Sequence, residues 1–416
     1  MNKQPSLFGG AMIIAGTVIG AGMLANPTAT SGIWFAGSLL VLLYTWFSML
    51  TSGLMILEAN THYPHGANFD TMVKDLLGRP WNIVNGLSVA FVLYLLTYAY
   101  ITAGGGLTAG ALGGLLPASS PDGAPLWMGQ LLFALVFAGC VWWSARLVDR
   151  FTSILIGGLV LSFIWATGGL IGSARLPVLL DSAAPAGTSY WIFVGAALPV
   201  CLASFGFHGN VSSLLKYFRG DARKVSRALW GGTLIALVVY ALWQLAVQGN
   251  LPRSAFGPVI AAEGKVGVLI AELSKFTATG SMAQILAFFS YTAIASSFLG
   301  VTLGLFDYIA DLCGFDDSRA GRSKAALITF LPPLLFSLRW PGGFVTVIAY
   351  VGLVATVWTA LTPAALLYAA RKKFGTGRGY SVYGGYGMML WVLLFGLANI
   401  AAMVLGMMGK LPVFAG

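Results

Sequence analysis

The chain contains eleven apolar stretches, each about as long as a membrane-spanning helix. A bilayer core about 30 Å thick requires roughly 20 apolar residues in a helix. Only 9% of the residues are charged, whereas soluble domains are roughly one quarter charged. We therefore predict an all-α integral membrane protein that forms a single transmembrane domain over residues 1–416. The predicted spans lie near residues 8–31, 33–58, 81–112, 125–143, 150–172, 190–213, 226–249, 281–311, 323–338, 344–369 and 386–409.

The basic residues are distributed unevenly between alternate loops. Of the 23 Lys and Arg residues, 17 fall on the side of the N-terminus and 6 on the other side. Because cytoplasmic loops of membrane proteins are enriched in Lys and Arg, this split predicts a cytoplasmic N-terminus. With an odd number of spans the C-terminus then lies outside the cell. The net charge of +10 is explained by this topology, and it does not indicate a nucleic-acid partner.

Two of the predicted spans carry helix-weakening residues near the middle of the membrane. The first contains Gly16-Thr-Val-Ile-Gly-Ala-Gly22, and the sixth contains Ala203–Asn210 after Pro199. Such glycines permit close backbone approach, and a GxxxG packing face is the alternative interpretation for Gly16 and Gly20. Paired interruptions at corresponding positions are typical of secondary transporters built on an inverted repeat. We predict repeats over about 6–172 and 190–369, followed by an extra helix at 386–409.

An interrupted helix presents backbone groups that suit a zwitterion. N–H groups at a half-helix N-terminus attract a carboxylate, and carbonyls at a half-helix C-terminus attract an ammonium group or a cation. The sequence has no repeated filter loop of a channel and no HExxH or paired deep acids of an intramembrane enzyme. Cys140, Cys201 and Cys313 lie in apolar runs and indicate neither a disulfide nor a metal site. The sequence therefore predicts a transporter without enzymatic activity and without a cofactor.

Five further features of the sequence are the segments Gly16–Met23, Leu54–Asn60, Phe91–Tyr100, Leu202–Asn210 and Ser296–Asp307. These segments resemble the hydroxy and aromatic amino acid permease family, within the amino acid-polyamine-organocation superfamily, and among its members the bacterial tryptophan-specific permeases. The resemblance extends from about residue 6 to the last span. It implies a leucine-transporter-like 5+5 fold in the bacterial inner membrane, with a periplasmic C-terminus. It further implies alternating-access symport of tryptophan driven by protons; sodium coupling, or tyrosine or serine as the main substrate, is the alternative.

The resemblance also implies a set of substrate-binding residues. The backbone and hydroxyl groups of the two interrupted spans would hold the α-carboxylate and α-amino groups, and aromatic neighbours would surround an indole. For the tyrosines, packing in the core or at the membrane interface is the alternative. The first set comprises Thr17, Ile19, Gly20, Ala21, Gly22, Ser204, Gly206 and His208. The candidate walls are Tyr94, Tyr98, Phe205, Phe207 and Val301.

Two groups of residues are candidates for ion coupling. His208 is the only histidine within a predicted span, and because histidine titrates near neutrality it could carry a proton or bind the substrate. A histidine that only stabilises the interrupted segment is the alternative. The span 150–172 has no lysine, which proton-coupled relatives in the wider superfamily carry there. The sodium candidates are Gly16, Ile19, Ala293, Ser296 and Ser297, although membrane serines also bond their own backbone.

Three acidic residues are predicted at the cytoplasmic interface, because each lies about 38 Å of helix from the outer end of its span. They are Glu58, Asp307 and Asp311. We interpret them as inner-gate residues or as partners of the basic loops.

Overall fold

The structure is a computed structural model that describes residues 6–64, 67–113, 124–276, 281–377 and 379–416. These residues form helices joined by turns and loops. The helices of the first half are α1 Leu7–Val18, α2 Gly22–Ala29, α3 Trp34–Asn60, α4 Phe69–Leu77, α5 Arg79–Gly113, α6 Leu126–Trp143, α7 Ala145–Gly172 and α8 Leu176–Leu179. Those of the second half are η1 Trp191–Phe193, α9 Val194–Ser204, α10 Asn210–Tyr217, α11 Ala222–Gln248, η2 Arg253–Phe256, α12 Gly257–Ala261, α13 Val266–Ser274, α14 Met282–Cys313, α15 Arg319–Arg339, α16 Phe344–Thr356, the π-helical η3 Val357–Leu361, α17 Thr362–Phe374 and α18 Gly385–Met407.

By length and composition, eight helical segments of the described chain could cross a membrane, and α1 with α2 makes a ninth if this pair, bent by 56°, is one span. The eight segments include the continuous run Phe344–Phe374. Two of the eleven predicted spans fall outside this set. The stretch 190–213 is divided between α9 and α10, and α15 carries Arg319 and Arg322 in its first turns, which leaves a short apolar stretch.

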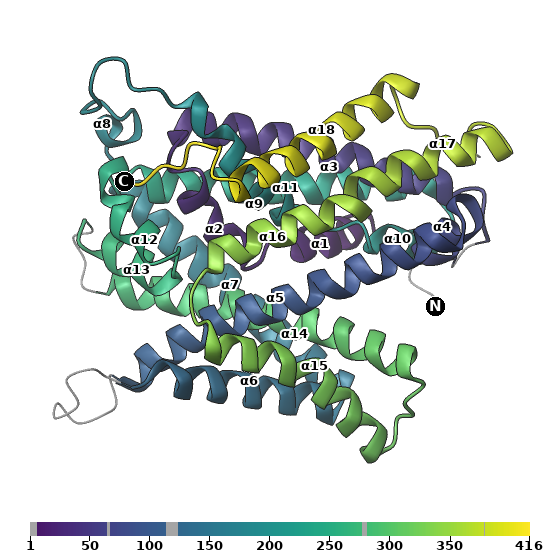
Figure 1. The fold of residues 1–416 in the computed structure, drawn as a ribbon, viewed down its shortest axis with the longest axis horizontal. Helices are drawn as coiled ribbons and strands as arrows, with labels where there is room; N and C mark the ends of the chain where they lie inside the picture. Colours follow the sequence, from purple (N-terminus) through teal and green to yellow (C-terminus); the bar gives the residue numbers. More distant parts are fainter. Residues whose placement is uncertain (1–5, 65–66, 114–123, 277–280, 378) are drawn as a thin grey trace.

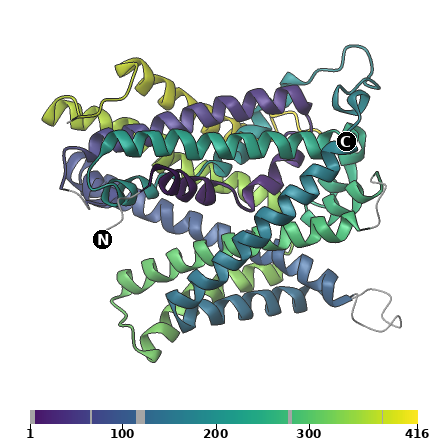
Figure 2. The same ribbon diagram turned by 180° about the vertical axis from the view of Figure 1, so that it is seen from behind.

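The helices form two groups, which Figures 1 and 2 show from opposite sides. One group contains α6, α14 and α15, with α5 and α7 packed against it, and the other contains α3, α11, α17 and α18. The helix α1 packs against α11, and α2 and α16 both pack against α9. In Figure 1 the N-terminal end, α4, α10 and the end of α17 lie on the right, while α8, α12, α13 and the C-terminus lie on the left.

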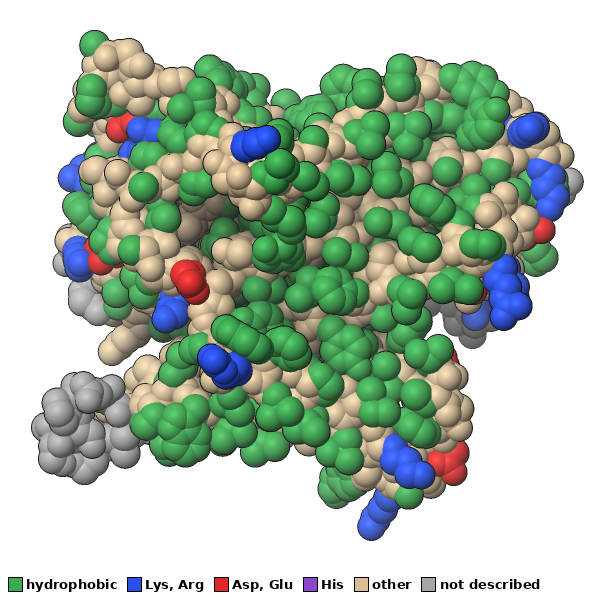
Figure 3. All heavy atoms as spheres, in the orientation of Figure 1, with side chains coloured by type: hydrophobic (Ala, Val, Ile, Leu, Met, Phe, Trp, Pro, Cys, Tyr) green, Lys and Arg blue, Asp and Glu red, His purple; other side chains and the backbone are tan. Residues whose placement is uncertain are grey.

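The surface between these two ends is strongly apolar. Large side chains such as Leu161, Trp165 and Trp143 are at least 70% exposed. Figure 3 shows hydrophobic side chains over the middle of one face and the charged side chains mainly towards its ends. A soluble monomer rarely exposes so large an apolar area, so this surface is suited to lipid, and the chain is a multi-pass membrane protein.

Candidate functional site

The first interrupted helix breaks where glycine was expected to weaken it. The helix α1 ends at Val18, Ile19 is extended with φ −74° and ψ 107°, and α2 begins at Gly22 without a side-chain cap at its N-terminus. The Ala21 N–H donates to the Ser297 hydroxyl at 3.1 Å. A Cβ atom on Gly20 would overlap this hydroxyl. We call residues 19–21 the first break. Glycine is required at position 20, because a side chain there would prevent the close approach of α14 to the backbone.

The second interrupted helix lies beside the first. The helix α9 ends at Ser204, and α10 begins at Asn210, also without a side-chain cap. We call residues 205–209 the second break. The Ser204 hydroxyl contacts the Gly22 carbonyl at 3.3 Å and Asn26 Oδ1 at 3.0 Å. On the far side, Asn210 Nδ2 donates to Thr17 Oγ1 at 2.6 Å. Contacts on both sides therefore join the two interrupted helices.

Tyr240 of α11 connects the ends of α1 and α9. Its hydroxyl lies 2.6 Å from the Val18 carbonyl oxygen and 2.7 Å from the Ser204 carbonyl oxygen. The ring is 1% exposed and packs edge-on against Phe205. Carbonyls at the end of a helix lack intrahelical partners and carry partial negative charge. The tyrosine therefore supplies one donor to two helix ends that would otherwise repel each other.

Both breaks line one cavity of about 870 Å³. Its walls come from α1, α2, α3, α4, α5, α7, α9, α10, α14, α16 and η3. From the breaks it extends to Asn68, Asp70 and Tyr308, which lie near the ends of helices towards the side where α1 begins. Asp70, at this far end, is the only acidic or basic side chain among its lining residues, histidine aside. A substrate carboxylate in the cavity has no Arg or Lys to pair with, so the uncapped N-termini of α2 and α10 are its available partners.

Most of the residues predicted for substrate binding line this cavity. On the two interrupted helices these are Thr17, Ile19, Gly20, Ala21, Gly22, Ser204, Gly206, Phe207 and His208, and Val301 joins them from α14. Phe205 is fully buried behind the wall against Tyr240. Tyr94 and Tyr98 are not brought into the cavity. The Tyr94 hydroxyl donates to the Ile328 carbonyl at 2.8 Å, and the Tyr98 hydroxyl donates to the Trp340 carbonyl at 2.6 Å. Both rings therefore lie on the side of α5 that faces α15.

His208 is buried at the second break with its ring held on two sides. Nε2 lies 2.6 Å from Ser52 Oγ of α3. Phe207 stacks on the ring at a centroid distance of 4.6 Å, and Trp358 meets it edge-on at 6.1 Å. The histidine thus lies where three chain segments meet at the cavity wall.

The residues predicted for sodium lie between α1 and α14. Gly16, Ile19, Ser296 and Ser297 line the cavity, while Ala293 is fully buried. Ser296 Oγ donates to the Ala293 carbonyl at 3.2 Å, and Ser297 accepts the Ala21 N–H. Both hydroxyls are therefore already engaged with backbone groups.

The three acidic residues have different surroundings. Glu58 is fully buried, and its carboxylate binds Arg371 through two hydrogen bonds of 2.7 Å. It also accepts the Val382 N–H at 2.6 Å, so it fastens the loop before α18 to α3 and α17. Asp307 shares a small surface depression with Arg322, and Asp311 is exposed.

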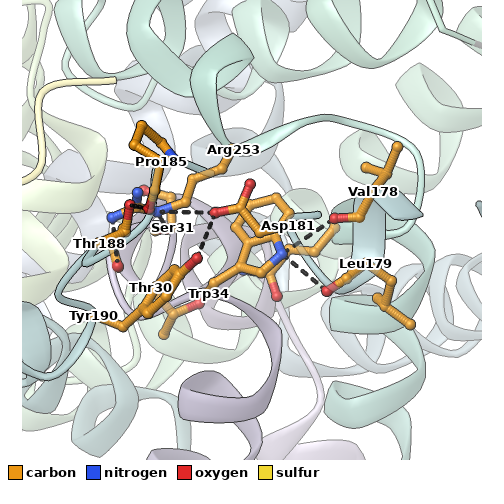
Figure 4. A network of polar contacts seen from close by, with 12 residues as sticks. Thr30, Ser31, Trp34, Val178, Leu179, Asp181, Pro185, Thr188, Tyr190 and Arg253 are labelled. Atoms are coloured by element: carbon orange, nitrogen blue, oxygen red, sulfur yellow. Dashed lines mark hydrogen bonds and ion pairs between the residues drawn. The ribbon is translucent and has the colours of Figure 1, made fainter. Parts of the chain in front are cut away.

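The opposite end of α2 is closed by a cluster around Arg253, which Figure 4 shows. Arg253 donates to the carbonyls of Ser31 at 3.3 Å and Gly32 at 2.9 Å. Its guanidinium also lies 4.0 Å from Asp181, and the ring centroids of Tyr190 and Phe414 are 4.9 and 4.1 Å from it. The cluster thus ties the chain after α2 to the segment before η1 and to the C-terminal residues.

Three residues that contact the site were not predicted, and of these only Trp358 lines the cavity itself. Ser52, Tyr240 and Trp358 contact the site from α3, α11 and η3. Ser52 and Tyr240 sit in unbroken apolar helices, where nothing in the sequence distinguishes them from core residues. Trp358 lies in a π-helical turn, and such turns occur frequently at functional sites but leave no reliable sequence pattern.

Comparison with known proteins places this geometry in context. The family model described as "Tryptophan/tyrosine permease family" matches residues 3–403. The chain is 56% identical to a tryptophan-specific transport protein of Haemophilus influenzae, over 100% of this chain and 99% of that protein. It is 49% identical to a tryptophan-specific transport protein of Pseudomonas aeruginosa, over 99% and 98% of the two chains. A low affinity tryptophan permease of Escherichia coli K12 is 42% identical, again over 99% and 98%.

Proposed function

The chain belongs to the tryptophan/tyrosine permease family, and from this premise we propose that it imports tryptophan across the bacterial inner membrane by secondary active transport. It is a transporter and not an enzyme. Its similarity to tryptophan-specific transport proteins extends over the whole chain, which supports tryptophan as the substrate. The observation that carries the mechanism is the cavity of about 870 Å³ lined by both helix breaks.

An inverted 5+5 repeat, with eleven spans in all, is part of this proposal. The order of elements supports it. In the first half a broken helix is followed by a straight helix, the short α4 and the long α5 of 35 residues. In the second half the broken pair α9–α10 is followed by the straight α11, the short α12 and α13, and the long α14 of 32 residues.

The substrate would bind by its zwitterionic part between the two breaks. The carboxylate approaches the uncapped N-termini of α2 and α10, and the ammonium group approaches carbonyls at the ends of α1 and α9. The indole then occupies the apolar part of the cavity near Phe207, Val301 and Trp358. The described residues that line the cavity include no Lys or Arg, which supports recognition of the carboxylate by helix ends rather than by an ion pair.

The orientation follows from the positive charges. We propose that the N-terminus is cytoplasmic and the C-terminus periplasmic. The cavity then opens towards the cytoplasm, and the Arg253 cluster closes the periplasmic side, as expected for one state of an alternating-access cycle.

We propose protons as the coupling ion. The hydroxyls of Ser296 and Ser297 are already bonded to backbone groups, which counts against a sodium site there, although their remaining lone pairs keep sodium as the alternative. The test is uptake of labelled tryptophan by purified protein in liposomes, with proton and sodium gradients imposed separately. Concentrative uptake with the proton gradient alone supports the proposal. Uptake with the sodium gradient alone supports the alternative, and no uptake with either gradient contradicts the function.

A further inference from the structure

One ring nitrogen of His208 is buried without a partner. The side chain is 2% exposed and lines the cavity. Nδ1 has no hydrogen-bond partner among the described residues. A buried polar atom left unpaired is unfavourable, so a ligand that supplies the missing group is favoured at this position.

The contacts of Nε2 determine which group is missing. Ser52 Oγ donates to the Met49 carbonyl at 2.9 Å, and this bond uses the only hydrogen of the hydroxyl. With that hydrogen on the Met49 carbonyl, a hydrogen on Nε2 satisfies the 2.6 Å contact between Ser52 Oγ and His208 Nε2. In the neutral ring Nδ1 consequently carries a lone pair and is an acceptor. We assign the tautomer from this network of donors.

The imidazole ring of His208 has a fixed orientation. Phe207 stacks on the imidazole with an interplanar angle of 26°, and Trp358 meets its edge at 89°. Phe207 is held in turn by Gly53, where an added Cβ atom would come within 2.6 Å of the Phe207 ring. Trp358 Nε1 is also buried without a partner among the described residues, but it is only a donor and cannot serve the same purpose.

We propose that Nδ1 of His208 accepts the ring N–H of an indole and so selects aromatic amino acids whose ring carries a hydrogen-bond donor. This inference rests on the proposed transport of tryptophan and adds the residue that recognises the side chain. Ser52 is a positioning residue that keeps the hydrogen on Nε2 and so leaves Nδ1 as the acceptor. Of the two roles that the sequence allowed for His208, this inference concerns substrate binding.

A pair of nearly isosteric compounds tests the contact. Tryptophan and benzothienylalanine, in which sulfur replaces the indole N–H group, compete for uptake of labelled tryptophan into liposomes. For the same proteins in detergent, the thermal stabilisation by each compound measures binding without transport. We expect the wild-type protein to prefer tryptophan by about 10- to 100-fold, the range for an unpaired buried acceptor.

The variants separate recognition from structure. His208→Ala should reduce the preference to less than about twofold. Ser52→Ala should reduce the preference by about twofold, because either tautomer of His208 is then allowed and about half of the molecules present the acceptor. The matched control is Ser337→Ala. Ser337 is fully buried like Ser52 and donates to the carbonyl three residues earlier at 2.8 Å, but it lies on α15 outside the cavity lining. Its loss should leave the preference unchanged.

Three results would overturn the inference. They are equal affinity of the wild-type protein for both compounds, an undiminished preference in His208→Ala, and a loss of preference in Ser337→Ala equal to that in Ser52→Ala. Failure of the proposed function is a different result. If tryptophan stabilises the protein far better than its sulfur analogue but is not transported, the contact stands and the transport function is wrong.

Discussion

The Tyr240 hydroxyl lies 2.6 Å from the carbonyl oxygen of Val18, the last residue of α1. The same hydroxyl reaches the Ser204 carbonyl at the end of α9 at 2.7 Å. One hydrogen therefore serves two helix ends that approach the same cavity. This bridge keeps the first and second breaks at a fixed separation, which a substrate that contacts both breaks requires.

Removing this hydroxyl should weaken both the fold and the binding of tryptophan. Tyr240→Phe keeps the ring packed on Phe205 but leaves two buried carbonyls without their donor, at a cost of about 1–3 kcal/mol. Thermal unfolding in detergent should show the loss of stability, and the uptake assay should show a higher KM for tryptophan. Tyr94→Phe is the control, since that hydroxyl donates to the Ile328 carbonyl outside the cavity lining. Equal KM increases in the two variants would contradict the role of the bridge.

A second prediction concerns the close approach of α14 to the first break. In Gly20→Ala the new Cβ atom overlaps the Ser297 hydroxyl, and such overpacking typically costs about 1–3 kcal/mol. The substitution also displaces the group that accepts the Ala21 N–H.

Because the next atom, Ser297 Cβ, would be 3.7 Å from the added methyl group, Ser297→Ala should relieve the clash. We expect the double variant to be more stable than Gly20→Ala in thermal unfolding. Gly157→Ala on α7, where no atom lies within 4 Å of the added Cβ, should be near neutral. If the double variant were no more stable than Gly20→Ala, the overlap with the Ser297 hydroxyl would not be the cause of the lost stability.

A third prediction concerns the closed end near Arg253. Arg253→Lys keeps the charge, but lysine lacks the planar fork that reaches the Ser31 and Gly32 carbonyls and lies over the rings of Tyr190 and Phe414. We expect tryptophan uptake to fall by about 10-fold or more at normal expression, because the outer closure is lost.

The comparison variant is Arg339→Ala, whose guanidinium lies over the neighbouring ring of Trp340 at 5.1 Å. It should transport at close to the wild-type rate. If Arg253→Lys took up tryptophan at the wild-type rate, the positive charge alone would be sufficient to keep this end closed, and the role of the guanidinium group would be contradicted.

A fourth prediction concerns acid stability at the N-terminal side of the molecule. Tyr63 donates to Asp75 Oδ2 at 2.5 Å, Lys373 Nζ lies 2.9 Å from Oδ1, and the two together lower the pKa of Asp75 below its usual 3.8. A lowered carboxyl pKa stabilises the fold above the unfolded pKa, and this stabilisation is lost as pH falls through the folded pKa.

Asp75→Asn should therefore be slightly less stable than wild type at pH 7, by less than about 1 kcal/mol because the pair is exposed. The difference should begin to shrink below about pH 4 and vanish as pH falls through the lowered pKa of Asp75. Thermal unfolding of both proteins over this pH range measures it. A stability difference that grows on acidification would have the wrong sign for this account.

Most of the predicted spans agree with helices long and apolar enough to cross a membrane, because lipid imposes a simple length rule on apolar sequence. The two breaks were predictable because Gly20 and Gly206 disfavour continuous helix, whereas Pro199 lies inside α9, which continues to Ser204. The sequence did not predict which side of a long helix faces the cavity. Because α5 is apolar on most sides, its sequence gives no sign that Tyr94 and Tyr98 face α15 rather than the cavity.

The contacts that complete the site come from segments far apart in the chain. Ser52 is 156 positions from His208, and Tyr240 is 222 positions from Val18. Pairings of this kind depend on how the helices pack, and hydropathy carries no information about them. The acidic residues illustrate the same limit, since only the packing of α17 on α3 reveals that Glu58 is paired with Arg371.

The most direct test of the central claim is a structure of the protein determined by cryo-electron microscopy with saturating tryptophan. We predict density for the amino acid between the first and second breaks. Its carboxylate should lie at the N-termini of α2 and α10, its ammonium group near the Val18 and Ser204 carbonyls, and its indole N–H next to His208. Tryptophan bound outside this cavity, or a cavity that stays empty while the same sample transports tryptophan, would contradict the account.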